Sequence, residues 1–181
     1  SAFQAGGKLL VCGNGGSAAD SEHIVGELMK GFQRRRPLPE QVTRQILSTP
    51  LEDRAYLVAH LQGALPAISL SSQSSLVTAA SNDIAADMIF AQQIYGYGRP
   101  GDVLLGITTS GVSRNVLLAL QLGRALGLYT IGLTGRGTPA LAAACDLAIC
   151  APYDLTYQIQ ECHQVIYHAL CADLEEAFFA G

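Results

Sequence analysis

Short apolar runs alternate with stretches of helical periodicity along most of the chain. Runs of this kind, bounded by Gly, Ser or Asp, are typical of strands that are buried on both faces. The five predicted strands are Lys8–Cys12, Ala67–Ser72, Asp102–Ser110, Tyr129–Gly135 and Asp146–Pro152. The predicted helices are Ala19–Lys30, Asn82–Tyr95, Ser113–Leu126, Pro139–Ala144 and Tyr157–Phe179. This alternation predicts an α/β fold, a three-layer sandwich around a parallel sheet.

The segment Gln33–Leu65 breaks the alternation because it contains no strand candidate. Pro39 and Pro50 stand where helices often begin, so we expect one or two helices there. At this length we expect a single domain over residues 1–181 with a helical excursion at about 33–65. We expect Lys30 and the basic run 34–36 to be solvated.

Composition limits the classes of function. Hydrophobic residues make up 49% of the chain and charged residues 14%, which favours surfaces shared with partner subunits. The net charge is −4, which argues against nucleic-acid binding. No apolar run has the length of a membrane span and no signal peptide is visible, so we expect a cytoplasmic protein without a membrane partner. The five cysteines lack zinc-finger spacing and are expected to be reduced, buried thiols.

The sequence GNGGS follows the first predicted strand and leads into a helix. Gly15 and Gly16 allow backbone N–H groups to approach an anion, and the helix N-terminus favours negative charge. Asn14 and Ser17 add polar side chains. The motif is neither a P-loop nor a dinucleotide-binding fingerprint. It predicts an anion site of moderate specificity.

A second loop, TTSGVSRN, also follows a strand and leads into a helix. Hydroxyls from Thr108, Thr109, Ser110 and Ser113 surround a glycine, which predicts a site for the phosphate of a sugar phosphate. The alternative is that Ser113 only caps its helix. Four hydroxyls exceed what one cap requires, so we favour the phosphate site.

Two helices carry polar residues that a structural role does not require. His23 and Glu27 share a helix face one turn apart, although most pairs at this spacing are merely exposed ion pairs. Gln160, Gln164 and His168 form one polar stripe on an otherwise apolar helix, and such a stripe needs partners or a function. His163 lies on a neighbouring face, where we expect it either to have a structural role or to support the site residues. The stripe and the His23–Glu27 pair allow a metal such as zinc, an acid–base pair of Glu27 and His168, or both.

Four motifs in order resemble the phosphoheptose isomerases of the sugar-isomerase (SIS) superfamily. They are CGNGGSAADSEHIVGEL, SND, GDVLLGITTSGVSRNV and IQECHQVIYH. The resemblance implies a flavodoxin-like, five-stranded parallel sheet and a homotetramer with active sites at subunit interfaces. It also implies that a phosphorylated seven-carbon sugar, sedoheptulose 7-phosphate, is isomerised to D-glycero-D-manno-heptose 7-phosphate.

The same resemblance assigns roles to residues. Glu27 resembles the general base that moves a proton through an enediol, and His168 its acid partner. The positions that bind Zn²⁺ in some members are matched by His23, Glu27, Gln160 and His168. The hydroxyls of Ser17, Thr109, Ser110 and Ser113 would hold the phosphate, and Asn14 and Asp83 the sugar hydroxyls. The candidate substrate-binding residues are therefore Asn14, Gly15, Gly16, Ser17, Asp83, Thr108, Thr109, Ser110, Ser113 and Gln160.

Three departures from the family pattern keep alternatives open. The helical segment that usually precedes AGGKLLVCG is absent from this sequence, the Gln33–Leu65 excursion is longer than usual, and Tyr157 stands where many members have an acidic residue. Isomerisation of another phosphosugar is therefore an alternative function. A second alternative is a non-catalytic SIS protein, either a tetrameric adaptor of the replication initiator or a sugar-phosphate sensor.

Overall fold

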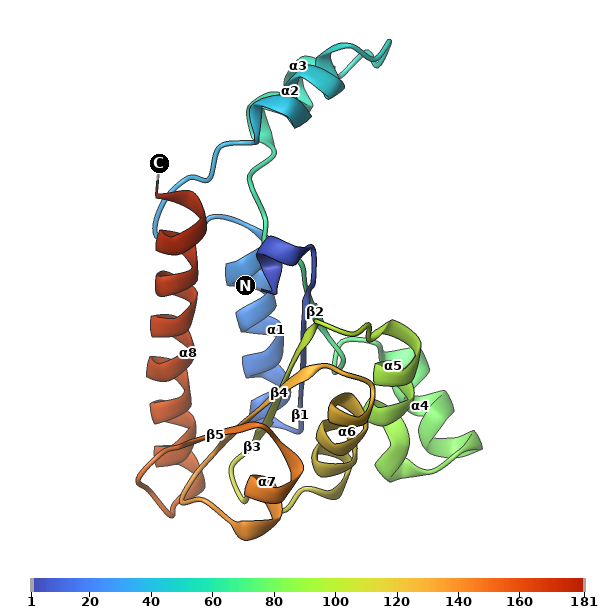
Figure 1. Cartoon of the computed structure of the whole chain (residues 1–181), viewed down its shortest axis with the longest axis vertical. Helices are drawn as coiled ribbons and strands as arrows, with labels where there is room; N and C mark the ends of the chain where they lie inside the picture. Colours follow the sequence, from blue (N-terminus) through green and yellow to red (C-terminus); the bar gives the residue numbers. More distant parts are fainter. Residues whose placement is uncertain (1, 181) are drawn as a thin grey trace.

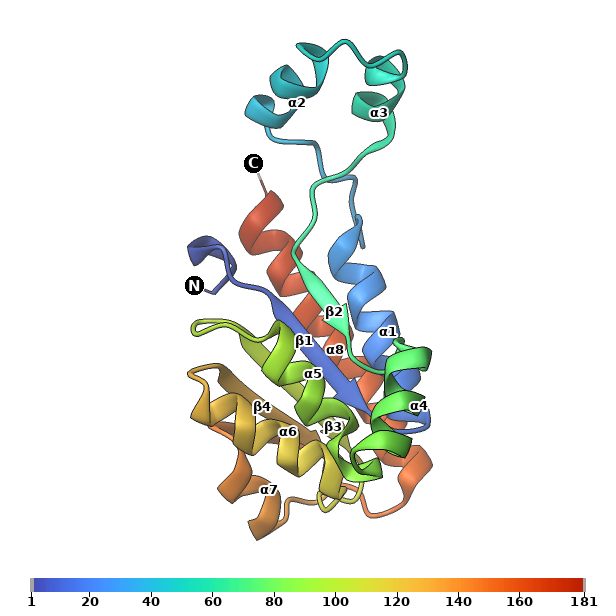
Figure 2. The ribbon, with the colours of Figure 1, turned by 90° about the vertical axis from the view of Figure 1, so that its right-hand side faces the viewer.

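The structure is a computed structural model that describes residues 2–180. A single sheet of five parallel strands runs through it in the order β2-β1-β3-β4-β5. The strands are β1 (Leu9–Gly13), β2 (Ala67–Ser69), β3 (Val103–Thr108), β4 (Tyr129–Thr134) and β5 (Leu147–Cys150). This strand order is that of flavodoxin-like folds, so the predicted fold class is confirmed. Figures 1 and 2 show the sheet between two layers of helices.

Alternating residues of the strands face the two helical layers. In β1, Leu10 and Cys12 pack with α5 (Ile89–Tyr97), α6 (Arg114–Ala125) and α7 (Pro139–Ala144). Val11 faces the other layer, which is formed by α1 (Gly16–Met29) and α8 (Thr156–Phe179). Both faces of the central strands are therefore covered, as their continuous apolar sequence predicts.

The edge strand β5 departs from that prediction. Three of its four residues are exposed and the fourth, Ile149, is only partly buried. Cys150 in β5 is therefore exposed. Cys162, which lies in α8 (Thr156–Phe179), is partly buried, so the expectation of five buried thiols is wrong for these two. All five thiols are free, as predicted.

One predicted helix is also wrong. Instead of a single helix over 82–95, the chain forms α4 (Ser74–Asp83), a short 3-10 turn (Ala86–Met88) and then α5. Ile84 and the extended Ala85 break the helix between them. The polar SSQSS sequence at 71–75 obscured the start of α4, and β2 ends at Ser69, earlier than expected.

The Gln33–Leu65 segment holds no strand but two short helices, α2 (Glu40–Leu47) and α3 (Arg54–His60), as predicted. This arm stands away from the sheet beyond the C-terminal ends of α1 and α8 (Figures 1 and 2). Neither arm helix contains a buried residue. None of the helices among residues 2–180 is both long and apolar enough to cross a membrane.

Arg36 at the base of the arm is fully buried, which corrects the expectation that the basic run is solvated. Its guanidinium donates to Glu175 Oε1 at 2.8 Å, to Leu28 O at 2.7 Å and to Glu27 O at 2.8 Å. The two carbonyls belong to the last turn of α1, where a helix lacks internal donors. Arg36 therefore caps the end of α1 and ties it to α8.

Candidate active site

The first group of candidate residues lies at the carboxyl ends of β1 and β3. These two strands are neighbours at the point where the strand order reverses, the usual ligand position in such folds. Gly15 has φ of 56°, a left-handed conformation that suits glycine, and Ser17 N–H donates to Asn14 O at 3.0 Å. Ser17 is buried in the first turn of α1. The predicted anion turn therefore opens onto the expected crevice.

The second loop brings its hydroxyls to the same place. Thr108 Oγ1 lies 2.9 Å from Ser113 Oγ and 3.4 Å from Ser110 Oγ. Ser113 is the N-cap residue of α6, yet its side chain makes no capping bond. The alternative that Ser113 only caps its helix is therefore not supported. Thr109 is partly buried and its carbonyl accepts from Gly135 N–H.

Asn115 joins the two loops and was not identified from the sequence. Its amide and that of Asn14 exchange two hydrogen bonds of 2.9 Å across 101 residues of sequence. Its position in the first turn of α6, two residues after Ser113, was the available signal. We call this group the hydroxyl cluster; its residues are Asn14, Gly15, Gly16, Ser17, Thr108, Thr109, Ser110, Ser113, Asn115 and Gln160.

Gln160 belongs to the hydroxyl cluster by contact. A Cβ atom placed on Gly16 would lie 2.2 Å from Gln160 Nε2, so the amide presses against the glycine backbone. Gln164, one turn further along α8, is exposed. Asp83 is exposed at the end of α4, where its carboxylate accepts from the Asn82 amide at 2.8 Å.

A second group lies further along α1 and α8. His23 Nε2 is 3.3 Å from Glu27 Oε1, and Lys30 Nζ is 3.1 Å from Glu27 Oε2. The His168 ring lies 5.0 Å from the His23 ring, and its Nε2 is buried without a hydrogen-bond partner. The structure therefore brings His23, Glu27 and His168 together, although they come from two helices.

Two further residues complete this second group and were not identified from the sequence. Tyr167 OH lies 2.9 Å from His23 Nδ1 and donates to Asp20 Oδ1 at 3.4 Å. Burial, followed by the Asp20 carboxylate, raises the pKa of Tyr167 to about 12. Burial also raises the pKa of Asp20. We call this group the histidine cluster; its residues are Asp20, His23, Glu27, Tyr167 and His168.

His163 has the structural role expected of it. It is buried, and its Nε2 lies 3.0 Å from the Thr134 carbonyl. Burial lowers its pKa and favours the neutral ring. Tyr157 lies exposed in the first turn of α8.

The predicted zinc ligands are only partly brought together in one chain. Two ligands about 2.1 Å from a tetrahedral zinc lie about 3.4 Å apart, which the 3.3 Å between His23 Nε2 and Glu27 Oε1 matches. Gln160 lies two turns of α8 away from His168. Over residues 2–180, no group of three or more His, Cys, Asp or Glu is arranged to hold a metal ion. One chain therefore offers two convergent ligands, which do not make a complete zinc site.

The fold and the hydroxyl-lined crevice together define the class of sugar-isomerase domains. A family model described as SIS domain matches residues 54–135. The match begins in α3 and ends just after β4, so it includes the second loop but not GNGGS.

Comparison over the whole chain narrows the class. The chain is 38% identical over 177 residues to a phosphoheptose isomerase of Roseiflexus sp., covering 98% of this chain and 77% of that protein. It is 42% identical to one of Pelobacter propionicus, covering 99% and 81%. The solved phosphoheptose isomerase of Neisseria gonorrhoeae superposes with a TM-score of 0.76 at 32% identity, covering 97% and 79%. The chain belongs to the phosphoheptose isomerase family.

Proposed function

We propose that this protein is an aldose–ketose isomerase that converts sedoheptulose 7-phosphate to D-glycero-D-manno-heptose 7-phosphate. The observation that carries the proposal is that a member of this family has both a hydroxyl-lined phosphate crevice and a histidine–carboxylate cluster. An isomerase needs both, because it must hold the phosphate and move one proton between two carbons.

In the hydroxyl cluster, phosphate would be bound without a cation. The N-termini of α1 and α6 both point into the crevice from the ends of β1 and β3. Thr108, Ser110 and Ser113 provide hydroxyl donors, and the Asn14–Asn115 pair offers amides to the sugar hydroxyls. This arrangement fixes the substrate by its phosphate end and leaves the carbonyl end to be positioned elsewhere.

In the histidine cluster, Glu27 is the candidate base. Its carboxylate would take a proton from C1 of the ketose, which leaves an enediol, and would return the proton to C2. His168, with a buried and unpaired Nε2, is available to protonate the oxygen that becomes a hydroxyl. Lys30 Nζ lies 3.1 Å from the second oxygen of Glu27 and would favour the ionised carboxylate.

Along α1, the two clusters are separated by about the length of the substrate or more. Ten residues of α1 separate Ser17 from Glu27, about 15 Å along the axis and about 80° around it. His23, which Glu27 contacts, is nearer to Ser17, but it still lies about 9 Å from Ser17 along the helix axis and about 120° around it. Seven bonds join C2 of the substrate to its phosphorus, and an extended chain gains about 1.2 Å per bond. These two atoms are therefore about 8 Å apart.

We therefore propose that the hydroxyl cluster of one copy faces the histidine cluster of another. This is the arrangement expected of a homotetramer with interfacial active sites. Exposed apolar side chains on α8, such as Val165 and Leu170, and on β5, such as Leu147, provide surface for such contacts. All five cysteine thiols are free, which accords with a cytoplasmic location.

Zinc is proposed only for the assembled protein. His23 and Glu27 would supply two ligands, and His168 of the same copy lies beside them, with its ring 5.0 Å from that of His23. Gln160 is the remaining candidate ligand. A bound zinc would polarise the substrate carbonyl. The proton transfer itself is assigned to Glu27 and His168, and the metal would increase its rate.

The test is turnover of sedoheptulose 7-phosphate, followed by NMR of the aldose product. Glu27→Gln should lower kcat by about 10²–10⁴-fold while leaving substrate binding nearly intact, because the phosphate is held elsewhere. The matched control is Glu22→Gln, an exposed carboxylate on the same helix, which should keep full turnover. Full activity of Glu27→Gln would refute the assignment. If the unaltered protein is inactive towards this sugar but turns over another phosphosugar, the proposed substrate is wrong and the proposed proton transfer still holds.

A further inference from the structure

The two loops of the hydroxyl cluster are joined by the paired side-chain amides of Asn14 and Asn115. We propose that these two asparagines are positioning residues, which hold the loops at one fixed spacing so that both loops bind the same phosphate group. The effect of the pair on turnover rests on the proposed function. Its effect on the binding of inorganic phosphate does not.

The two loops lose their common support where the sheet ends. Strands β1 and β3 are paired as far as Gly13 and Ile107. Beyond this point, among the residues that the structure describes, no backbone hydrogen bond joins 14–18 to 109–116. The two amide hydrogen bonds between Asn14 and Asn115, each 2.9 Å long, connect the loops there. The asparagine pair is therefore placed to set the spacing of the loops.

Each amide belongs to a residue close to the groups that would hold the phosphate. Asn14 comes directly before Gly15 in the turn that leads into α1, and its carbonyl accepts from Ser17 N–H at 3.0 Å. Asn115 is the second residue of α6 and follows Ser113 by two positions. A change in the distance between the two side chains would therefore move the backbone N–H groups and hydroxyls of both loops relative to each other.

The two amides have one defined mutual orientation. Each donates one N–H to the oxygen of the other, so two hydrogen bonds close the pair. Asn115 Oδ1 also accepts from Val116 N–H at 3.0 Å, which an amide turned the other way round could not do. Each side-chain nitrogen has a second N–H that the pair does not use. The pair can therefore hold the loops and still offer a donor to a sugar hydroxyl.

The exposure of the pair makes truncation informative. Asn14 is exposed and Asn115 is only partly buried, so water can replace a truncated amide and no buried group is left unpaired. What is lost is the fixed spacing, because a ligand that needs both loops must then bring them together when it binds. Either truncation opens the whole pair. The second truncation should therefore remove nothing more.

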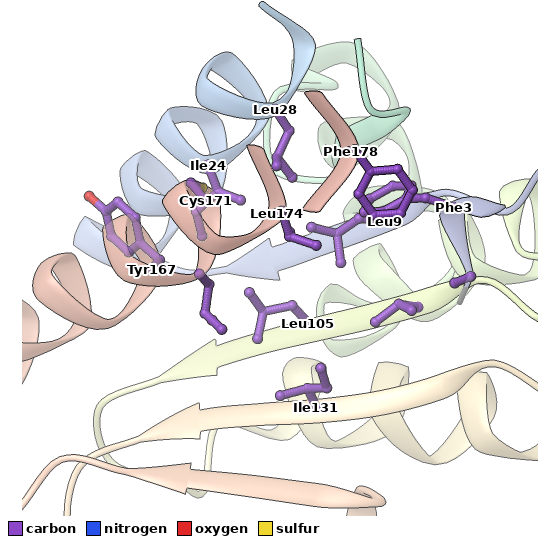
Figure 3. Close-up of a pocket in the computed structure, with 13 residues that line it drawn as sticks. Phe3, Leu9, Ile24, Leu28, Leu105, Ile131, Tyr167, Cys171, Leu174 and Phe178 are labelled. Atoms are coloured by element: carbon purple, nitrogen blue, oxygen red, sulfur yellow. The ribbon is translucent and has the colours of Figure 1, made fainter. Parts of the chain in front are cut away.

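Inorganic phosphate is a suitable probe because it reports the loops alone. The cavity of about 280 Å³ between α1, α8 and the sheet is lined by apolar side chains such as Leu28, Leu105 and Phe178 (Figure 3). Phosphate placed there would lose its hydration without gaining donors, so this cavity does not compete for the probe. Inorganic phosphate also lacks the sugar, so a contact between an outward amide N–H and a sugar hydroxyl cannot contribute to its affinity.

The test is a double-mutant cycle on the dissociation constant of inorganic phosphate, measured by titration calorimetry. We expect Asn14→Ala and Asn115→Ala each to weaken binding by about 10-fold, which is the typical net contribution of two amide hydrogen bonds. The double variant should also weaken binding by about 10-fold and not by about 100-fold, because the two residues act as one unit. The matched control is Gln121→Ala, which removes an exposed amide from the same helix, α6, and should leave the affinity unchanged.

Turnover separates this proposal from the proposed function. In all three variants KM for sedoheptulose 7-phosphate should rise by about 10-fold with kcat nearly unchanged, because the histidine cluster is untouched. Additive losses of phosphate affinity would overturn the proposal, since each amide would then contact the phosphate by itself. Lower thermal stability with unchanged phosphate affinity would also overturn it and mark the pair as merely structural. If the unaltered protein does not turn over this sugar but the phosphate cycle shows the expected coupling, the proposed function is wrong and the role of the pair still holds.

Discussion

The buried Arg36–Glu175 pair connects the arm, the end of α1 and α8, and its strength can be measured. Glu175 is 1% exposed and accepts from Arg36 Nε, Phe32 N–H and Gln33 N–H, each at 2.8 Å. These bonds outweigh the cost of burial and lower the pKa of Glu175 to about 2 from an ordinary 4.5. The perturbation is Glu175→Gln, which keeps the shape and removes the charge.

The magnitude follows from the shift. A difference between 4.5 and about 2 corresponds to roughly 3 kcal/mol of stabilisation at neutral pH. Glu175 lies near the C-terminal end of α8, at the edge of the protein, so solvent screening reduces this figure. The variant, however, also leaves the buried Arg36 without a counter-charge, which is itself destabilising. We expect Glu175→Gln to lower the free energy of unfolding by about 2 to 3 kcal/mol at pH 7.

The assay is urea unfolding of both proteins at pH 7 and pH 3. Because the folded-state pKa of Glu175 lies below the unfolded-state value, its contribution is complete above about pH 5 and is lost as the pH falls from 4.5 towards 2. The gap between the two proteins should therefore shrink by about half at pH 3. Glu176→Gln is the matched control, since this neighbour is exposed and pairs with Arg34 at the surface; it should cost less than about 0.5 kcal/mol. Equal effects of the two variants, or a gap that does not depend on pH, would refute this reasoning.

Two further predictions concern the metal and the packing. Removal of metal with a chelator should lower turnover, and added Zn²⁺ should restore it. Turnover and metal content are measured on the same samples. Turnover that a chelator does not alter would contradict a role for zinc and leave Glu27 and His168 as a metal-free acid–base pair. Gly106→Ala should destabilise the protein by about 1–3 kcal/mol in thermal unfolding, because its Cβ would lie 2.9 Å from Val116 Cγ1. Gly26→Ala, with nothing within 4 Å of the new Cβ, should instead stabilise α1 by about 0.5–1 kcal/mol, and the reverse order of the two variants would contradict the packing described here.

Most of the fold could be predicted because the buried strands carry a strong local signal. Runs such as Val103–Thr108 are apolar on both faces, and only a parallel sheet covered by helices buries both faces. The break at Ile84 and Ala85 could not be predicted, since it arises where α4 and α5 turn against each other rather than from a Pro or Gly. The burial of Arg36 was equally hidden, because its partner Glu175 lies 139 residues away.

The candidate site was predictable only in part for the same reason. Loops that follow strands are local features, so the hydroxyls of Thr108 and Ser113 were found from the sequence. The contact of Tyr167 with His23 joins two helices and shows no periodic pattern of its own. The distance between the two clusters depends on helix length and direction, which a list of motifs does not contain.

Complementation between two inactive variants tests the shared active site most directly. Glu27→Gln removes the base from the histidine cluster, and Ser113→Asp places a carboxylate where phosphate would bind, so neither protein alone should turn over sedoheptulose 7-phosphate. If the two clusters act across copies, a mixture unfolded and refolded together should regain a fraction of the turnover, because some mixed assemblies contain one intact site. A mixture as inactive as its parents, in assemblies shown to contain both chains, would contradict the account.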